Sequence, residues 1–192
     1  AAKGSFGLVQ APDFLSLFFC VDPAGRTPAP PFCSLRVQYP YSGMEPLTAD
    51  RISAKIHEIE QRVGKLSPMQ KVLIGTDGSV TNLLEMATGH SVSITTRVQD
   101  IVAADTEAAA ALAIEPGDEV NHRIVELKDS VTGNVLIYAV SRTPLRRLAP
   151  EFRQDLMRAD IPIGRILSRH RIESRREITD ARVVQAGTDL AR

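Results

Sequence analysis

Two arginines stand inside apolar, strand-like stretches of this chain, where their side chains could bind an anion. Arg123 lies in "NHRIVEL", and Arg142 ends "IYAVSR". A guanidinium that points inward from such a strand needs a partner, because an unpaired buried charge is costly. A small organic carboxylate suits it, since the planar guanidinium can bind both carboxylate oxygens at once. The alternative partner is a carboxylate of the protein itself, for example Glu126 or Glu119.

The glycine-rich stretch "IGTDGSVTNLLE" (74–85) does not match the motifs that bind nucleotide phosphates. A Walker A loop carries Lys and then Ser or Thr after its second glycine, and this stretch has neither that lysine nor a GxGxxG spacing. Its glycines instead predict a tight turn that leads into a helix capped by Ser79. The four histidines of the chain are dispersed, without the paired spacing of a metal site. We therefore expect no bound nucleotide and no metal.

The composition of the chain excludes several classes of partner. Basic and acidic residues balance at 23 each, so no net charge favours nucleic acid or a membrane surface. No run of 18 apolar residues is present, which argues against a membrane span. Cys20 and Cys33 fit neither a disulfide framework nor a metal knuckle and predict free thiols in a reducing cytosol. We expect a cytoplasmic protein that binds a small molecule; the sequence does not determine its oligomeric state.

The elements that would position the arginines follow from apolar periodicity and turn residues. The segments 119–127 and 134–142 flank a turn and predict an antiparallel hairpin, and the alternating segment 91–98 predicts a further strand. The segment 171–184 alternates well enough for another strand, and "KVLIG" (71–75) suits a short strand or a helix end. Helices are predicted over 48–63, 79–88, 105–114, 149–160 and 161–170. Helices that cover one face of a mostly antiparallel sheet give an α+β fold.

Residues 1–46 differ from the rest of the chain in their proline content. Seven of the twelve prolines fall there, and "PAGRTPAPPF" (23–32) can form neither a helix nor a central strand. We expect 1–46 to be a poorly structured N-terminal extension and 47–192 to be one domain.

The chain resembles the chorismate pyruvate-lyase family, most of all its archaeal-type branch, in four segments that follow one another in a fixed order. These are "IGTDGSVTNLLE", "HSVSITTRVQDIV", "GDEVNHRIVELKDSVTGNVLIYAVSRTPL" and "ADIPIGRILSRHRIESRREI". The resemblance covers roughly residues 50–178 and implies an antiparallel sheet with helices on one side and helical flaps over an internal pocket. The same fold serves as the effector-binding UTRA domain of GntR-type repressors, so fold alone does not decide function.

The resemblance implies a reaction in which chorismate loses pyruvate and leaves 4-hydroxybenzoate, with no metal or organic cofactor. Carried over residue by residue, it implies that Arg123 grips the ring carboxylate and that Val80 and Ile163 contact the ligand through their backbone. It also implies that Arg142 is a second pocket arginine. The alternative is a non-catalytic module of the UTRA type that binds a small aromatic carboxylate.

The sequence departs from the family pattern near its end. The family also uses a glutamate on a final strand, and here no acid follows Asp189. We expect the domain 47–192 to lack that last strand and its glutamate. Glu173 in "RIESRREI" is the nominated catalytic substitute, and an ion pair with Arg175 or Arg176 is its alternative role.

Overall fold

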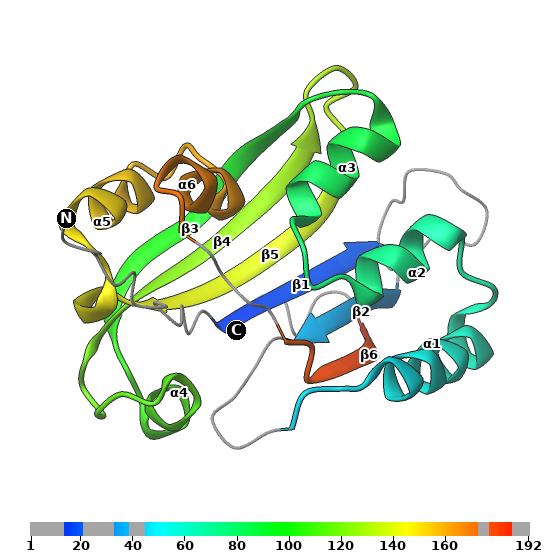
Figure 1. The fold of residues 1–192 in the computed structure, drawn as a ribbon, viewed down its shortest axis with the longest axis horizontal. Coiled ribbons are helices and arrows are strands. Elements are labelled where there is room, and N and C mark those ends of the chain that lie inside the picture. The colour runs from blue at the N-terminus through cyan, green and yellow to red at the C-terminus, as the bar shows by residue number, and fades with distance from the viewer. Residues whose placement is uncertain (1–13, 21–32, 39–44, 173–176, 186–192) are drawn as a thin grey trace, which may run out of the picture.

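A six-stranded sheet forms the centre of the computed structural model, in the order β3-β4-β5-β1-β2-β6, and every neighbouring pair is antiparallel (Figure 1). The structure describes residues 14–20, 33–38, 45–172 and 177–185. The strands are β1 (Phe14–Cys20), β2 (Cys33–Gln38), β3 (Val92–Ala103), β4 (Glu119–Asp129), β5 (Val135–Pro144) and β6 (Asp180–Gln185). With the helices described below, they confirm the α+β class predicted from the sequence.

The pairing of β4 with its two neighbours decides which side chains share a face of the sheet. Arg123 lies opposite Gln99 of β3 and opposite Ser141 of β5. Side chains directly opposite one another in an antiparallel sheet lie on the same face, and successive side chains alternate. Arg123 therefore shares one face, which we call the helix face, with Gln99 and Ser141. His122 and Arg142 lie on the opposite face.

Most helices in the described part of the chain pack on the helix face. These are α1 (Ala49–Val63), α2 (Pro68–Gly75), α3 (Val80–Thr88), α5 (Pro150–Met157) and α6 (Ile163–Arg169). Buried residues of α1 to α3, such as Ile59, Ile74 and Leu84, form the main core with Val125 and Leu127 of β4. The short helix α4 (Thr106–Leu112) packs instead on Val120, which points to the opposite face. A 3₁₀ turn, η1 (Leu145–Arg147), follows β5.

The helix boundaries follow the capping residues in the sequence. Ser79 accepts a hydrogen bond from the backbone N–H of Asn82 at the start of α3, and Gly89 ends the helix in the left-handed region at φ 71°. Ser67 forms a capping box with Gln70 at the start of α2, so "KVLIG" is the end of a helix and not a strand. The glycines of the 74–89 stretch thus bound a helix, as predicted.

The structure differs from the sequence-based expectation within residues 1–46. The segments 14–20 and 33–38 form β1 and β2, which pair with each other and join β5 to β6 in the sheet. None of the seven prolines of this region lies in either strand; they stand at positions 12, 23, 28, 30, 31, 40 and 46. The prolines therefore exclude strands only where they occur, and the apolar runs between them supply two strands.

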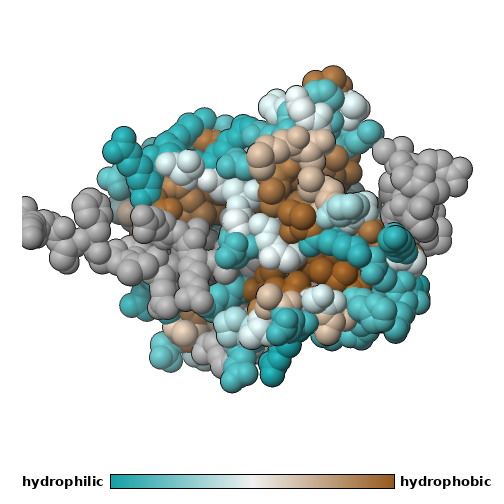
Figure 2. All heavy atoms as spheres, turned by 45° about the vertical axis from the view of Figure 1, so that its right-hand side comes forward, coloured by the Kyte–Doolittle hydropathy of each residue, from teal (hydrophilic) through white to brown (hydrophobic). Residues whose placement is uncertain are grey.

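Apolar surface gathers over α2 and α3 (Figure 2), where the side chains of Met69, Val72 and Met86 are exposed.

None of the helices in the described residues combines the length and the apolar character that crossing a membrane requires. In the same residues, no cluster of His, Cys, Asp or Glu side chains could hold a metal ion.

The turn between β4 and β5 provides a first prediction. The Asp129 carboxylate accepts hydrogen bonds from His90 and from the backbone N–H groups of Thr132 and Val131, and these lower its pKa to about 2. An unfolded Asp has a pKa of about 4, so this stabilisation is complete above about pH 4 and is lost as the pH falls toward 2. Asp129→Asn should lower the urea midpoint at pH 7 and flatten the loss of stability between pH 4 and 2.

Asp77→Asn, at an exposed position, is the matched control and should keep the wild-type pH profile. Parallel profiles for wild type and Asp129→Asn would contradict this account of the turn.

Candidate functional site

Arg123 is the largest fully buried side chain of the described residues, with 2% of its surface exposed. Its Nη2 donates to the carbonyl oxygen of Ile161 at 3.1 Å and, more weakly, to Thr96 Oγ1 at 3.5 Å. Its Nε has no acceptor, and no carboxylate of the described residues forms an ion pair with it. Burial lowers the guanidinium pKa to about 10, against the opposing charge of Asp160. At neutral pH the group is therefore a buried cation that no carboxylate of the described residues contacts directly.

The two internal carboxylates that could have neutralised Arg123 are engaged elsewhere. Glu126 lies on the opposite face, where its oxygens approach Arg97 at 2.8 Å and Lys128 at 3.0 Å. Glu119 approaches Arg153 of α5 at 3.7 Å. The alternative of a buried Arg–Glu pair is thus absent from the described part of the chain.

Arg123 is part of a row of polar side chains on the helix face, which we call the polar strip. Its members come from β3, β4 and β5 and are Gln99, Asn121, Arg123, Ser141 and Thr143. Both amide atoms of Asn121, Gln99 Oε1 and Thr143 Oγ1 are buried without a hydrogen-bond partner in the described residues. Each such group costs about 1–3 kcal/mol relative to a satisfied one. The unpaired groups of the polar strip therefore lower the stability of the folded protein.

On the same face of β4 and β5, the side chains become apolar toward the β4–β5 turn. There its side chains are Val125, Leu127, Ile137 and Ala139, and they pack in the main core beneath α1 to α3. A β-strand that only supports a core would continue this apolar pattern. From Arg123 toward the start of β4 the side chains on this face are polar, and this half of the face is the candidate site.

The hairpin formed by α5 and α6 lies over the β3–β4 part of the sheet (Figure 1). Three side chains of the sheet, Thr96, Gln99 and Arg123, donate to backbone carbonyl oxygens of residues 156–161, which form the end of α5 and its connection to α6. The buried side chains of the hairpin itself are apolar; they are Phe152, Leu156, Ile166 and Leu167. The hairpin thus brings apolar side chains and backbone carbonyls to a face of the sheet that carries polar side chains.

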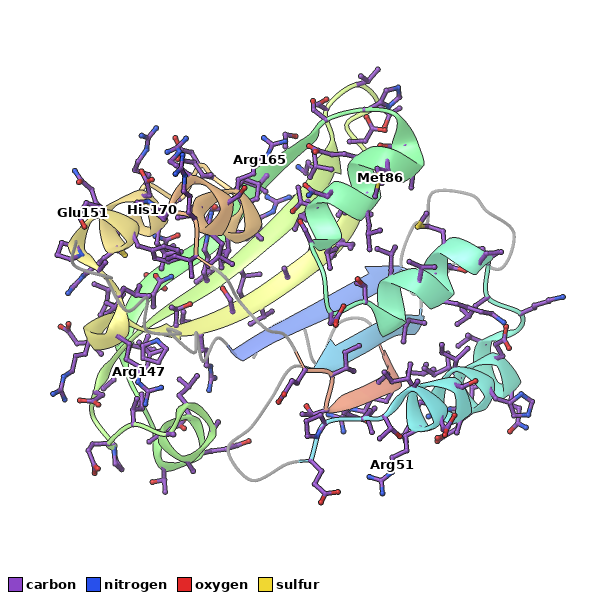
Figure 3. All side chains as sticks on the ribbon, viewed as in Figure 1. Arg51, Met86, Arg147, Glu151, Arg165 and His170 are labelled. Carbon is purple, nitrogen blue, oxygen red and sulfur yellow. The ribbon has the colours of Figure 1, made fainter. Side chains whose placement is uncertain are left out.

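The first turns of α3 and α6 lie against each other. A Cβ added to Gly164 would stand 3.5 Å from Ser79 Oγ and 3.8 Å from Thr81 Oγ1. Arg165 extends from α6 toward α3 (Figure 3) and forms an ion pair with Glu85, whose pKa is lowered first by the backbone N–H of Val92 and then by Arg165.

Val80 and Ile163 are the first residues of these two helices, so the structure brings them into one region. Backbone N–H groups in a first helical turn have no intrahelical acceptor and can donate to a ligand. Ile163 also follows closely on Ile161, the residue that binds Arg123.

The two other residues that the sequence predicted for the site are Arg142 and Glu173. Arg142 lies opposite His122 on the other face of the sheet, and the pKa of His122 is lowered by burial and by the charge of Arg142. Of the two arginines predicted on β4 and β5, only Arg123 belongs to the polar strip. Glu173 lies outside the described residues.

The neighbours of Arg123 in the polar strip were not predicted from the sequence. Asn121 stands two positions before Arg123 in "NHRIVEL", a spacing that places both side chains on one face of a strand. Ser141 and Thr143 carry the same signal on the partner strand. Polar residues at alternate positions in two paired apolar strands were the available evidence for the polar strip.

Comparison with known proteins found a family whose model matches this chain. The model of a family described as chorismate pyruvate-lyase Rv2949c-like matches residues 74–192. A protein named "Putative lyase MJ0807" from Methanocaldococcus jannaschii is 41% identical over 114 residues, which are 57% of this chain and 53% of that protein. The chain thus spans about half the length of this curated relative.

A solved structure, the C-terminal domain of Yurk from Bacillus subtilis, is 12% identical and covers 70% of this chain and 89% of its own. Its TM-score of 0.38 is too low to establish a shared fold.

The uncompensated charge of Arg123 leads to a prediction about stability. Arg123→Met keeps an unbranched, flexible side chain and removes a buried cation, so it should raise the free energy of unfolding of the ligand-free protein by about 1–3 kcal/mol. Arg97→Met is the matched control; it removes a partner of the buried Glu126 and should lower stability. Denaturant unfolding of both variants measures this. Marked destabilisation by Arg123→Met would show that the arginine serves the fold.

Proposed function

The chain belongs to the chorismate pyruvate-lyase Rv2949c-like family, and on this premise we propose that it is a carbon–oxygen lyase that converts chorismate to 4-hydroxybenzoate and pyruvate. The observation that carries the proposal is the buried Arg123 guanidinium without an anionic partner in the described residues. Chorismate would need a fixed counter-ion for its carboxylate in a site shielded from water, and this guanidinium can be that counter-ion.

The reaction is an elimination driven by aromatisation. Chorismate carries a carboxylate on its ring and a second one on the enolpyruvyl ether. Removal of the proton at the ring carbon that bears the hydroxyl forms the aromatic ring as the neighbouring carbon–oxygen bond to the enolpyruvyl group breaks. The released enolpyruvate takes up a proton and becomes pyruvate. No oxidant is needed, so the protein must orient the substrate, exclude water and stabilise charge on the departing oxygen.

The described residues support three of these tasks. In the proposal, Arg123 binds the ring carboxylate and sets the orientation of the ring. The first-turn N–H groups of Val80 and Ile163 donate to oxygens of the substrate, as amides without intrahelical acceptors can. The α5–α6 hairpin, which hydrogen bonds hold over the polar strip, excludes water. We assign removal of the ring proton to Glu173, which follows α6 in the sequence.

A second candidate function is the binding of a small aromatic carboxylate without chemistry, as in UTRA sensor domains. The composition of the polar strip favours it. The strip holds a guanidinium, two amides and two hydroxyls, but no carboxylate that could take a proton from the ring. Binding without catalysis therefore needs only the residues of the polar strip, whereas the lyase reaction also needs a base.

The direct test of the reaction is incubation with chorismate, followed by the absorbance of 4-hydroxybenzoate and by an assay for released pyruvate. We expect the two products in equal amounts. Glu173→Gln should lower kcat by about 100-fold or more, because it removes the general base while keeping the size of the side chain. Tight binding of 4-hydroxybenzoate without any turnover would replace the lyase with the binding module.

The direct test of the binding site compares two arginines on opposite faces of β4 and β5. Arg123→Ala should weaken the binding of 4-hydroxybenzoate by about 2–5 kcal/mol, because a buried carboxylate would lose its counter-ion. Arg142→Ala removes the same charge from the other face and should leave the affinity within about threefold of wild type. Isothermal titration calorimetry measures both. A loss of affinity in Arg142→Ala as large as that in Arg123→Ala, or larger, would contradict a site on the helix face.

A further inference from the structure

Asn121 and Thr143 form a buried polar pair to which the lyase proposal gives no role. They lie directly opposite each other on β4 and β5 and are 0% and 2% exposed. Neither amide atom of Asn121 nor the hydroxyl of Thr143 has a hydrogen-bond partner in the described residues. Two strands thus present donors and acceptors without partners in the described residues at one point of the helix face.

The chemistry of this pair differs from that of Arg123. A side-chain amide and a hydroxyl are neutral, and each can both donate and accept a hydrogen bond. They suit a neutral oxygen that also does both, such as a hydroxyl group, whereas a carboxylate or phosphate favours a cation. The polar strip therefore combines an anion position at Arg123 with a hydroxyl position at Asn121 and Thr143.

The spacing of the two positions fits one small ligand. Asn121 and Arg123 are two residues apart on β4 and point to the same face, a separation of roughly 6.6 Å along the strand. This is close to the length of a six-membered ring with a carboxylate at one end and an oxygen at the other. The apolar side chains of the α5–α6 hairpin, such as Leu156 and Phe152, can pack on the ring.

We propose that Asn121 and Thr143 form a subsite that recognises the hydroxyl group at the end of the ligand remote from its carboxylate. The subsite selects para-oxygenated ring acids over ring acids that lack the oxygen. This inference rests on the proposed function in one respect, that Arg123 binds the carboxylate. It adds two specificity-determining residues to that site.

The test is the ratio of two dissociation constants, that of benzoate over that of 4-hydroxybenzoate, measured by calorimetry. These acids share the ring and the carboxylate and differ by the hydroxyl alone. The ratio should be about tenfold or more in the wild-type protein, because benzoate leaves the buried amide unpaired. In Asn121→Leu the ratio should fall to within about twofold of one, with the affinity for benzoate retained.

Matched threonine variants control for effects of folding. Thr143→Val removes the hydroxyl at nearly constant volume and should also lower the ratio. Thr95→Val makes the same change on the opposite face, opposite Glu126, and should keep the wild-type ratio. If Asn121→Leu does not fold, the comparison of these two valine variants decides the question. Thermal unfolding without ligand should show Asn121→Leu to be at least as stable as wild type, whereas a purely structural asparagine would lose stability.

The possible failures are distinguishable. Equal affinities of the wild-type protein for benzoate and 4-hydroxybenzoate would overturn the subsite and leave the carboxylate position at Arg123 in place. A ratio that Asn121→Leu and Thr143→Val both leave unchanged would do the same. Failure of the wild-type protein to bind either acid would overturn the subsite together with the proposed function.

Discussion

A positive charge buried without an ion-pair partner among the described residues is the constraint on which the rest of the structure depends. The Arg123 guanidinium is held in place by a carbonyl of the α5–α6 connection, and its Nε has no acceptor in the described residues. A fold seldom keeps such a group for stability, because breaking or omitting one half of an ion pair costs several kcal/mol. Its presence in the middle of a sheet is explained if the missing anion arrives with the ligand.

The surrounding elements are arranged around this charge. The β3–β5 part of the sheet fixes the position of Arg123 and its polar neighbours, while the half of the face nearer the turn is filled by the main core. The α5–α6 hairpin contributes apolar side chains and backbone carbonyls, and the first turns of α3 and α6 meet beside it. Strands carry Arg123 and its polar neighbours, and short helices cover them, as the proposed binding of a small acid away from water requires.

The sequence predicted the α+β class, the boundaries of α3 and the inward direction of Arg123, because capping residues and alternation act locally. It could also have excluded Glu126 as a partner, since residues three apart on a strand lie on opposite faces. The face of Arg142 could not be predicted. The β4–β5 register shifts by one residue at Leu127 and Lys128, and this bulge inverts the face of every later residue of β5. The strands between the prolines of residues 1–46 depend on long-range pairing, which local signals do not reveal.

A crystal structure of the protein with bound 4-hydroxybenzoate tests the central claim most directly. We expect a carboxylate oxygen of the ligand to lie about 2.7–2.9 Å from a nitrogen of the Arg123 guanidinium. We also expect the ring to lie between the polar strip and the α5–α6 hairpin. A ligand bound elsewhere, with Arg123 still unpaired, would contradict the assignment of Arg123 to the site.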